Sequence, residues 1–211
     1  MSALKTCARP CAERVGDEGV GADTCAIILA GGTGERFGDP RGKQFAELCG
    51  LPIMSWSVMA FDRAPSVSSI VIVCAPDKVS AVQQEVLSRL TLAKPVGFAP
   101  SGATRQDSVY SGLQAVPRDA ALVAVHDSAR PLIEVVSIER CCAAVRADAS
   151  LAGAICANRS VDTLKLVEGN KIVATPNREF YWVAQTPQVF HAKPLMAAYK
   201  AALWEGFAGT D

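Results

Sequence analysis

Short apolar runs recur along the chain and alternate with stretches of helical spacing. Four largely apolar runs are typical of strands buried on both faces of a parallel sheet: residues 25–29, 69–74, 121–125 and 151–156. Between them, apolar residues recur at three- and four-residue steps, which predicts helices over residues 53–63, 78–90, 108–115 and 135–146. This alternation predicts an α/β fold with an open, mostly parallel, Rossmann-like sheet and helices on both faces. Ligands of such sheets bind beyond the carboxyl ends of the strands.

The alternation breaks between about residues 159 and 185. Two short stretches, residues 163–167 and 171–174, flank the turn Glu168-Gly169-Asn170 and predict a β-hairpin arm that projects from the domain. An edge hairpin packed on its own domain is the alternative. A last helix is predicted over residues 194–204, and residues 1–23 are polar and aperiodic, so we expect a flexible extension before one domain over residues 24–211.

Charge and hydropathy narrow the class of protein. The 211 residues carry 21 basic and 21 acidic side chains, so no net charge favours nucleic acid or an anionic membrane surface. No apolar run approaches the roughly 20 residues of a membrane-spanning helix. The first 24 residues lack the apolar core of a secretory signal. We therefore expect a cytoplasmic protein that binds neither nucleic acid nor membranes, with any anion site made by a local cluster.

The eight cysteines fit neither a metal site nor a disulfide framework. Cys25, Cys74 and Cys156 lie in strand-like runs, where cysteine behaves as a small buried apolar residue. Cys7 and Cys11 could chelate a metal, but no second pair at zinc-site spacing completes four ligands. Cys141 and Cys142 fall in a helical pattern and Cys49 in a turn, so we expect no dedicated metal site and no disulfides.

A glycine-rich segment follows the first predicted strand and reads Ala30-Gly31-Gly32-Thr33-Gly34-Glu35-Arg36. Glycines let backbone N–H groups approach a phosphate chain closely, and Arg36 and the later Lys43 supply positive charge. A tight strand–helix turn with two surface cations is the alternative. Gln44 after Lys43 excludes a P-loop, which needs Ser or Thr there, and Phe37 occupies a position that a dinucleotide fingerprint gives to a small residue.

Further motifs stand in order along the chain: Gly102-Ala103-Thr104-Arg105-Gln106-Asp107-Ser108-Val109, Val125-His126-Asp127-Ser128-Ala129-Arg130-Pro131, Asp162-Thr163-Leu164-Lys165 and Gln185-Thr186-Pro187-Gln188. With the glycine loop they resemble the nucleotide-diphospho-sugar transferase superfamily and, within it, the 2-C-methyl-D-erythritol 4-phosphate cytidylyltransferase family. The resemblance runs from about residue 25 to residue 211. It implies transfer of a cytidylyl group from CTP to 2-C-methyl-D-erythritol 4-phosphate, with release of pyrophosphate, in non-mevalonate isoprenoid biosynthesis.

The resemblance also implies roles for individual residues. Arg36 and Lys43 are the implied catalytic cations, which stabilise charge as one phosphate attacks another. The implied CTP-binding residues are Ala30, Gly31, Gly32, Thr33, Gly34, Gly102, Ala103 and Ser108. The implied residues for the second substrate are Asp127, Arg130, Thr163, Arg178 and Thr186.

Ser108 has an alternative role, and the resemblance also implies a second subunit and a metal cofactor. Ser108 is as readily a helix cap as a cytosine ligand. Arg178 lies on the proposed arm and in the family reaches the partner subunit's site, which implies a homodimer. Mg²⁺ is the implied cofactor, held mainly by the triphosphate and water. A phosphate monoester is already anionic near neutral pH, so no general base is required.

The chain departs from the family at two places. Gly42 stands where relatives usually have proline, and because Lys43 keeps its seven-residue offset from Arg36 we expect a change only in loop stiffness. Relatives continue past the equivalent of Asp211 into an Asn-x-Lys-like element whose lysine helps bind the substrate phosphate. We therefore expect a C-terminal end that is apparently truncated and weak binding of the phosphate substrate.

Three other functions compete with this interpretation. Ribitol-5-phosphate cytidylyltransferases share the chemistry, but their loop lysine typically comes one residue later and their arginine-centred second motif differs. A non-catalytic nucleotide-binding paralogue is disfavoured by the presence of Arg36, Lys43, Asp127 and Arg130 together. An NAD-binding module is disfavoured by the glycine loop itself.

Overall fold

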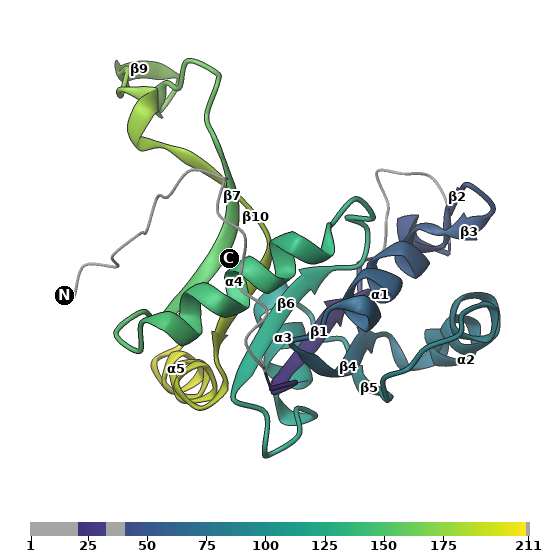
Figure 1. Cartoon of the computed structure of the whole chain (residues 1–211). Helices are drawn as coiled ribbons and strands as arrows, with labels where there is room; N and C mark the ends of the chain where they lie inside the picture. The colour runs from purple at the N-terminus through teal and green to yellow at the C-terminus, as the bar shows by residue number, and fades with distance from the viewer. Residues whose placement is uncertain (1–20, 33–40, 210–211) are drawn as a thin grey trace.

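The protein is an open six-stranded sheet with helices on both faces and a hairpin that projects from one end (Figure 1). The computed structural model describes residues 21–32 and 41–209. The strand order is β5-β4-β1-β6-β10-β7, with bounds Val96–Pro100, Val67–Cys74, Thr24–Leu29, Leu122–Asp127, Trp182–His191 and Gly153–Arg159. The first four strands pair in parallel, whereas β10 is antiparallel to both β6 and β7. The expected fold class, an open and mostly parallel α/β sheet, is confirmed.

Alternate residues of the central strands face opposite helical layers. From β1, Ala26 and Ile28 pack with α1 (Ile53–Arg63) and α4 (Val135–Ala147) on one face. Cys25 and Ile27 pack with α3 (Arg105–Gln114) and α5 (Ala192–Glu205) on the other face. A strand whose two faces are both covered must be apolar throughout, which is why these strands read as continuous apolar runs.

The expected helices all exist, with one difference in kind. Helix α1 has the predicted bounds, and α3, α4 and α5 differ from them by a few residues. Residues 78–90 form short helical pieces of different pitch instead of one regular helix: η3 (Pro76–Lys78), α2 (Val79–Ala81), the π-helical η4 (Val82–Val86) and η5 (Leu87–Arg89). Val82 and Val86, four residues apart, are both buried, so the apolar spacing was correct although the backbone is irregular.

Two strands of the sheet were not predicted, and both contain proline. Strand β5 is the short edge strand Val96–Pro100, whose Gly97 and Pro100 obscured its pattern. Strand β10 holds Gln185 to Gln188 at its centre, where its pairing with β7 shifts register between Ala184 and Gln188. Because proline has no N–H to give to a ladder, this interruption falls at Pro187.

The hairpin predicted around Glu168-Gly169-Asn170 is present as β8 (Leu166–Glu168) and β9 (Lys171–Ala174). Gly169 and Asn170 have φ values of 50° and 66°, the left-handed pair that a tight two-residue hairpin turn requires. The hairpin forms its own two-stranded sheet beyond the ends of β7 and β10 and projects from the body, so it is an arm and not an edge hairpin packed on the domain (Figure 1).

The chain just before β1 is tied to the body. The Asp23 carbonyl accepts a hydrogen bond from the Ala121 N–H at 2.8 Å, and its carboxylate pairs with Arg146 of α4. Asp23, placed by the sequence at the end of a flexible extension, is therefore held in the structure; residues 1–20, with Cys7 and Cys11, lie outside the described residues. Over residues 21–32 and 41–209, no helix has the length and apolar character needed to cross a membrane.

Candidate functional site at the carboxyl edge of the sheet

Three loops that carry the sequence motifs meet where the parallel strands end. In register, Leu29 at the end of β1 lies opposite Asp127 at the end of β6. Backbone N–H groups just past each strand donate to the neighbouring strand: Ala30 to Val73 at 2.7 Å, Ser101 to Cys74 at 2.9 Å and Ser128 to Leu29 at 2.9 Å. The loops after β1, β5 and β6 therefore form one continuous surface at this edge.

The loop after β1 lies against the loop after β5 because Gly31 has no side chain. A Cβ atom at Gly31 would stand 2.5 Å from the Cβ of Ser101. Ala30 is buried, whereas Gly31 and Gly32 are exposed and leave their backbone open to a ligand. Thr33, Gly34 and Arg36 lie outside the described residues.

Gln44 fastens the glycine loop from behind. The residue is 2% exposed, and its Nε2 donates to the carbonyl oxygens of Ala30 at 3.1 Å and Gly32 at 3.4 Å. Lys43 is exposed at the start of the short helix η2 (Lys43–Phe45), next to buried Gln44 and Phe45. The two buried neighbours set the place of the lysine relative to the glycine turn. From the sequence, Gln44 served only to exclude a P-loop, and this hydrogen-bonding role was not predicted.

Gly42 differs from a proline in more than stiffness. Its φ is 100°, in the left-handed half of backbone space, whereas proline is fixed near −65°. A Cβ here would also approach the Gln44 side chain to 2.6 Å. The expectation that only stiffness changes is therefore wrong, because the backbone before Lys43 follows a path that proline cannot take.

The loop after β5 is closed by a capped helix. Thr104 is the N-cap of α3: its hydroxyl accepts from the Asp107 N–H at 3.0 Å, and the Asp107 carboxylate accepts from the Thr104 N–H at 3.1 Å. Ser108 is therefore not the cap. Its hydroxyl accepts from the Gly102 N–H and donates to the Thr104 carbonyl, both at 3.0 Å, which holds Gly102 and Ala103 against the helix.

Asp127 lies between two arginines at the end of β6. Its Oδ2 accepts from Nε of Arg130 at 2.9 Å, and its Oδ1 lies 3.6 Å from Nε of Arg105. Arg130 also donates to the side chain of Gln185, and Arg105 donates to Gln188 at 3.3 Å. Arg105 belongs to the motif that begins at Gly102 but was not among the expected site residues. It enters the site because the first turn of α3 faces the end of β6.

A buried histidine supports this loop. The Asp127 N–H donates to Oγ1 of Thr186 at 3.4 Å, and that hydroxyl lies 2.9 Å from Nδ1 of His126, whose Nε2 lies 3.3 Å from the Arg130 carbonyl. Burial lowers the pKa of His126 to about 4 from 6.5, so the ring is neutral near pH 7. A neutral ring that accepts from Thr186 at Nδ1 donates from Nε2 to Arg130. The hydroxyl of Ser57 from α1 lies 3.1 Å from the Ser128 carbonyl and 3.3 Å from the Arg130 carbonyl, so its one proton also serves this loop.

Thr163 and Arg178 belong to the arm. Arg178 opens the short helix η6 (Arg178–Phe180), and its Nη1 donates to the Val161 carbonyl at 2.7 Å. Thr163 lies in the connection between β7 and β8. The structure thus brings Ala30, Gly31, Gly102, Ser108, Asp127, Arg130 and Thr186 to the same edge of the sheet. It leaves Thr163 and Arg178 on the projecting arm of the same chain (Figure 1).

The described part of the site offers no ready metal cage. Among residues 21–32 and 41–209, no three His, Cys, Asp or Glu side chains are grouped to hold an ion. Both carboxylate oxygens of Asp127 already face arginines.

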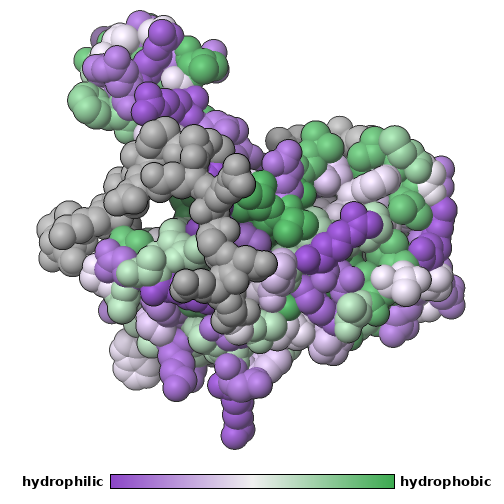
Figure 2. All heavy atoms as spheres, in the orientation of Figure 1, coloured by the Kyte–Doolittle hydropathy of each residue, from purple (hydrophilic) through white to green (hydrophobic). Residues whose placement is uncertain are grey.

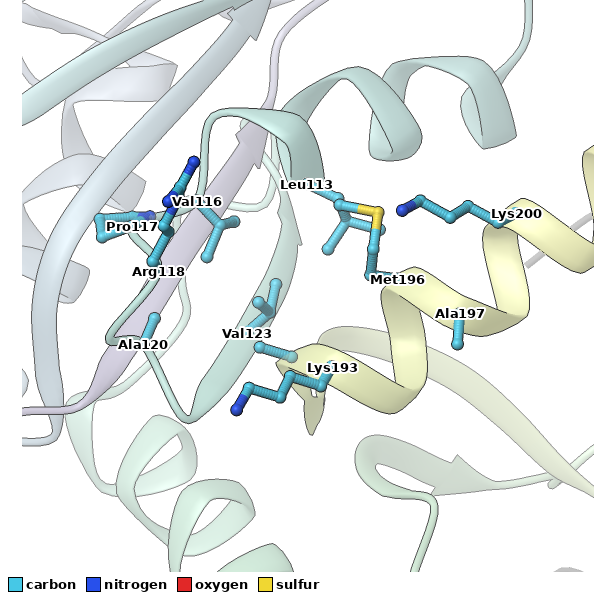
Figure 3. Close-up of a pocket in the computed structure, with 11 residues that line it drawn as sticks. Leu113, Val116, Pro117, Arg118, Ala120, Val123, Lys193, Met196, Ala197 and Lys200 are labelled. Carbon is cyan, nitrogen blue, oxygen red and sulfur yellow. The ribbon is translucent and has the colours of Figure 1, made fainter.

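Two cavities lie outside the glycine-loop site. One, of about 470 Å³, is floored by apolar residues at the end of α3 and the start of α5, with Arg118, Lys193 and Lys200 among its lining (Figure 3). The other, of about 450 Å³, lies between the start of α3 and the end of α5 and includes Arg105, Tyr199 and Phe207. Among the expected site residues that the structure describes, none lines either cavity, whereas Arg105 contacts both the Asp127 loop and the second cavity.

Comparison with known proteins identifies the family. The sequence model of IspD, 2-C-methyl-D-erythritol 4-phosphate cytidylyltransferase, matches residues 24–211. The chain belongs to this family. The family's protein from Caldanaerobacter subterraneus subsp. tengcongensis is 36% identical over 188 residues, which cover 88% of this chain and 81% of the relative. The one from Prochlorococcus marinus is 40% identical over 187 residues, which cover 88% and 80%.

Solved structures of the family share the fold. The 4-diphosphocytidyl-2C-methyl-D-erythritol synthase of Anaerococcus prevotii superposes with a TM-score of 0.76 at 26% identity, covering 89% of this chain and 78% of that one. The 2-C-methyl-D-erythritol 4-phosphate cytidylyltransferase of Francisella tularensis gives 0.70 at 27% identity, covering 87% and 79%.

Proposed function

We propose that this protein transfers the cytidylyl group of CTP to 2-C-methyl-D-erythritol 4-phosphate. The products are 4-diphosphocytidyl-2-C-methyl-D-erythritol and pyrophosphate, in non-mevalonate isoprenoid biosynthesis. The observation that carries the proposal is the junction of the loops after β1, β5 and β6, which bear the family's ordered motifs, at one edge of the sheet. Ligands of open α/β sheets bind at this edge.

The CTP triphosphate lies over the glycine loop in this proposal. Gly31 and Gly32 are exposed residues whose backbone N–H groups would bind its oxygens, and Thr33 and Gly34 are assigned the same role from the motif. Lys43 and Arg36 are the catalytic residues, because a phosphate oxygen that attacks the α-phosphorus builds negative charge on equatorial and leaving oxygens. Fixed cations stabilise that charge more in the transition state than in the ground state. No proton needs to be removed from the attacking phosphate monoester.

Cytosine lies against the loop after β5. The backbone of Ala30, Gly31, Gly102 and Ala103 lines this position in the proposal. The Ser108 hydroxyl uses its one proton on Thr104 and one acceptor position on Gly102, so it retains one acceptor position. The exocyclic amino group of cytosine is a donor and matches that position.

The second substrate lies beside Asp127 and Arg130. The Arg130 guanidinium suits a phosphate or hydroxyl oxygen, and the Asp127 carboxylate accepts from a hydroxyl group of the polyol. The Thr186 hydroxyl is bonded on both sides, to the Asp127 N–H and to His126. We therefore assign Thr186 mainly to positioning Asp127, with one acceptor position left for substrate.

Mg²⁺ fits this site as an ion carried by the nucleotide. The described residues supply no cluster of ligands, and magnesium keeps much of its coordination to phosphate oxygens and water. When bound, it would offset charge on the triphosphate. Lys43, Arg36 and the glycine loop hold and orient the nucleotide.

We also propose that two subunits complete each other's sites through the arm. The arm and the adjoining end of β10 expose large apolar side chains: Val161, Leu166, Val167, Ile172, Val173, Phe180, Tyr181, Trp182 and Val183. In Figure 2 the projecting arm shows hydrophobic residues among hydrophilic ones. Burial of this surface against a second copy would bring Thr163 and Arg178 to the partner's Asp127 loop.

Mixing two defective variants tests this exchange. Arg178→Ala and Lys43→Ala homodimers should each be nearly inactive. In a mixed dimer, the subunit with Lys43 intact receives Arg178 from the other, so one of the two equivalent sites is complete. Random mixing makes about half of the dimers mixed, so about a quarter of wild-type activity should return. Sedimentation checks the dimer directly, and a mixture that stays inactive although mixed dimers form contradicts the exchange.

Pyrophosphate release tests the main proposal. Wild-type protein with CTP and 2-C-methyl-D-erythritol 4-phosphate should release pyrophosphate, and ribitol 5-phosphate should be a much poorer substrate. Lys43→Ala should lower kcat strongly, whereas Lys193→Ala, an exposed lysine at the start of α5, should not. Absence of turnover with wild-type protein would refute the activity. A cytoplasmic location stays part of the proposal, and cell fractionation checks it.

A further inference from the structure

Two cysteines far from the glycine loop lie in direct contact. Cys141 on α4 and Cys156 on β7 have their Sγ atoms 3.6 Å apart, where the helix packs on the edge strand of the sheet. A disulfide bond has its sulfurs about 2.0 Å apart, so a closing movement of about 1.6 Å would join them. Neither thiol has a place in the proposed cytidylyl transfer.

The other cysteines of the described chain differ from this pair. Cys142 is next to Cys141 in sequence, but its sulfur lies 3.8 Å from Oγ1 of Thr24. Cys25 and Cys74 are buried in separate strands, and Cys49 is exposed in a turn. Helix geometry explains the contrast, since adjacent residues on a helix point in different directions and only Cys141 faces β7.

The environment of the two thiols is unequal. Cys156 is partly exposed and Cys141 is buried. A hydrogen bond from the Cys141 thiol lowers the pKa of Cys156, and the charge of Arg140 acts in the same direction against the effect of burial. The pKa of Cys141 is raised, by the same hydrogen bond and by burial. Cys156 is thus the thiol that reaches the thiolate form, which is the nucleophilic form of cysteine.

We propose that Cys141 and Cys156 form a disulfide when the protein meets a hydroperoxide. The Cys156 thiolate attacks the terminal peroxide oxygen, the O–O bond breaks, and a sulfenic acid forms on Cys156. The leaving group is hydroxide from hydrogen peroxide or an alkoxide from an alkyl hydroperoxide, and it takes a proton to become water or an alcohol. The Cys141 sulfur then attacks the Cys156 sulfur, the S–O bond breaks, and the second hydroxide leaves with the Cys141 proton as water. Two thiols are oxidised to one disulfide, and one peroxide is reduced.

The crosslink would tie two elements that adjoin the proposed site. Strand β7 leads into the arm, and α4 follows the loop that carries Asp127 and Arg130. A covalent bond between them fixes the base of the arm to the body.

Peptide mapping of the full chain tests the disulfide. The reduced protein is treated with hydrogen peroxide, free thiols are alkylated, and trypsin is added without reductant. Cleavage after Arg140, Arg146 and Arg159 places the two cysteines on separate peptides, residues 141–146 and 147–159. These two peptides should appear joined, with the sum of their masses less two hydrogen atoms and plus one alkyl group on Cys142, and should separate when dithiothreitol is added.

Matched variants assign the sulfur atoms, since peptide 141–146 contains both Cys141 and Cys142. Cys142→Ala should keep the crosslink and Cys156→Ala should lose it. Cys141→Ala should leave Cys156 as a sulfenic or sulfinic acid, and circular dichroism verifies that each variant is folded. The inference is overturned if both cysteines of the oxidised wild-type protein are alkylated, or if the crosslink disappears in Cys142→Ala and persists in Cys141→Ala.

Discussion

Gln44 offers the sharpest test of how the glycine loop is held. Gln44→Met keeps the length and shape of a straight side chain and removes its amide donors. The Gly32 carbonyl, on an exposed residue, can turn to water, whereas the Ala30 residue is 3% exposed. Leaving a buried acceptor without a donor costs about 1–3 kcal/mol. We expect this penalty to loosen the loop, so that CTP binding must restore its order.

The expected result is a weaker nucleotide complex. A cost of about 1–3 kcal/mol corresponds to a factor of about 5–150, which is the predicted range for the increase in the Kd for CTP. Isothermal titration of CTP into wild-type protein and Gln44→Met measures it. Gln114→Met, at an exposed glutamine ending α3, is the control and should bind CTP normally. Wild-type affinity in Gln44→Met, with the protein folded, would refute the reasoning.

Three further changes test other parts of the structure. Gly112→Ala should destabilise the fold by about 1–3 kcal/mol in urea unfolding, because the added Cβ would stand 2.7 Å from the side chain of Ile27 in β1. Gly97→Ala is the control and should leave the free energy of unfolding unchanged by any clash, since its Cβ would meet no described atom within 4 Å. The free energy of unfolding should have its full value above pH 6.5 and should fall by up to about 3 kcal/mol as the pH drops toward 4. The reason is that His126 takes up a proton near pH 6.5 in the unfolded chain, whereas in the native state its pKa is lowered to about 4. His126→Gln should flatten this pH dependence, and an unchanged pH dependence would contradict the assignment. Gly42→Pro should lower the thermal midpoint and reduce the catalytic rate, since its φ of 100° is closed to proline; a variant as stable and active as wild type would show that the loop follows another path.

The sheet and its helices could be predicted because burial leaves a clear pattern. Residues 25–29 are apolar throughout since helices cover both faces of β1, and the spacing in α1 gave its bounds without error. Strand β10 escaped notice because its pairing is interrupted at Pro187 and its centre is polar. Those polar residues serve the site: Gln185 and Gln188 accept hydrogen bonds from Arg130 and Arg105.

Part of the site could be predicted from motifs, but the residues that hold it in place could not. Asp127 and Arg130 are close in sequence and come together at the end of one strand. Arg105, Gln44 and Ser57 act across elements distant in sequence, and a single sequence carries no mark of such contacts. His126 stands within a motif, but nothing in the sequence assigned it a role. The structure gives it a buried, neutral place that holds Thr186 and Arg130.

The structure of the protein with bound CTP tests the central claim most directly. The account predicts the triphosphate over the exposed turn at Gly31 and Gly32, with Nζ of Lys43 within hydrogen-bonding distance of a phosphate oxygen and cytosine against Gly102. A nucleotide found instead in the cavity lined by Arg118, Lys193 and Lys200, with Lys43 turned to solvent, would contradict it.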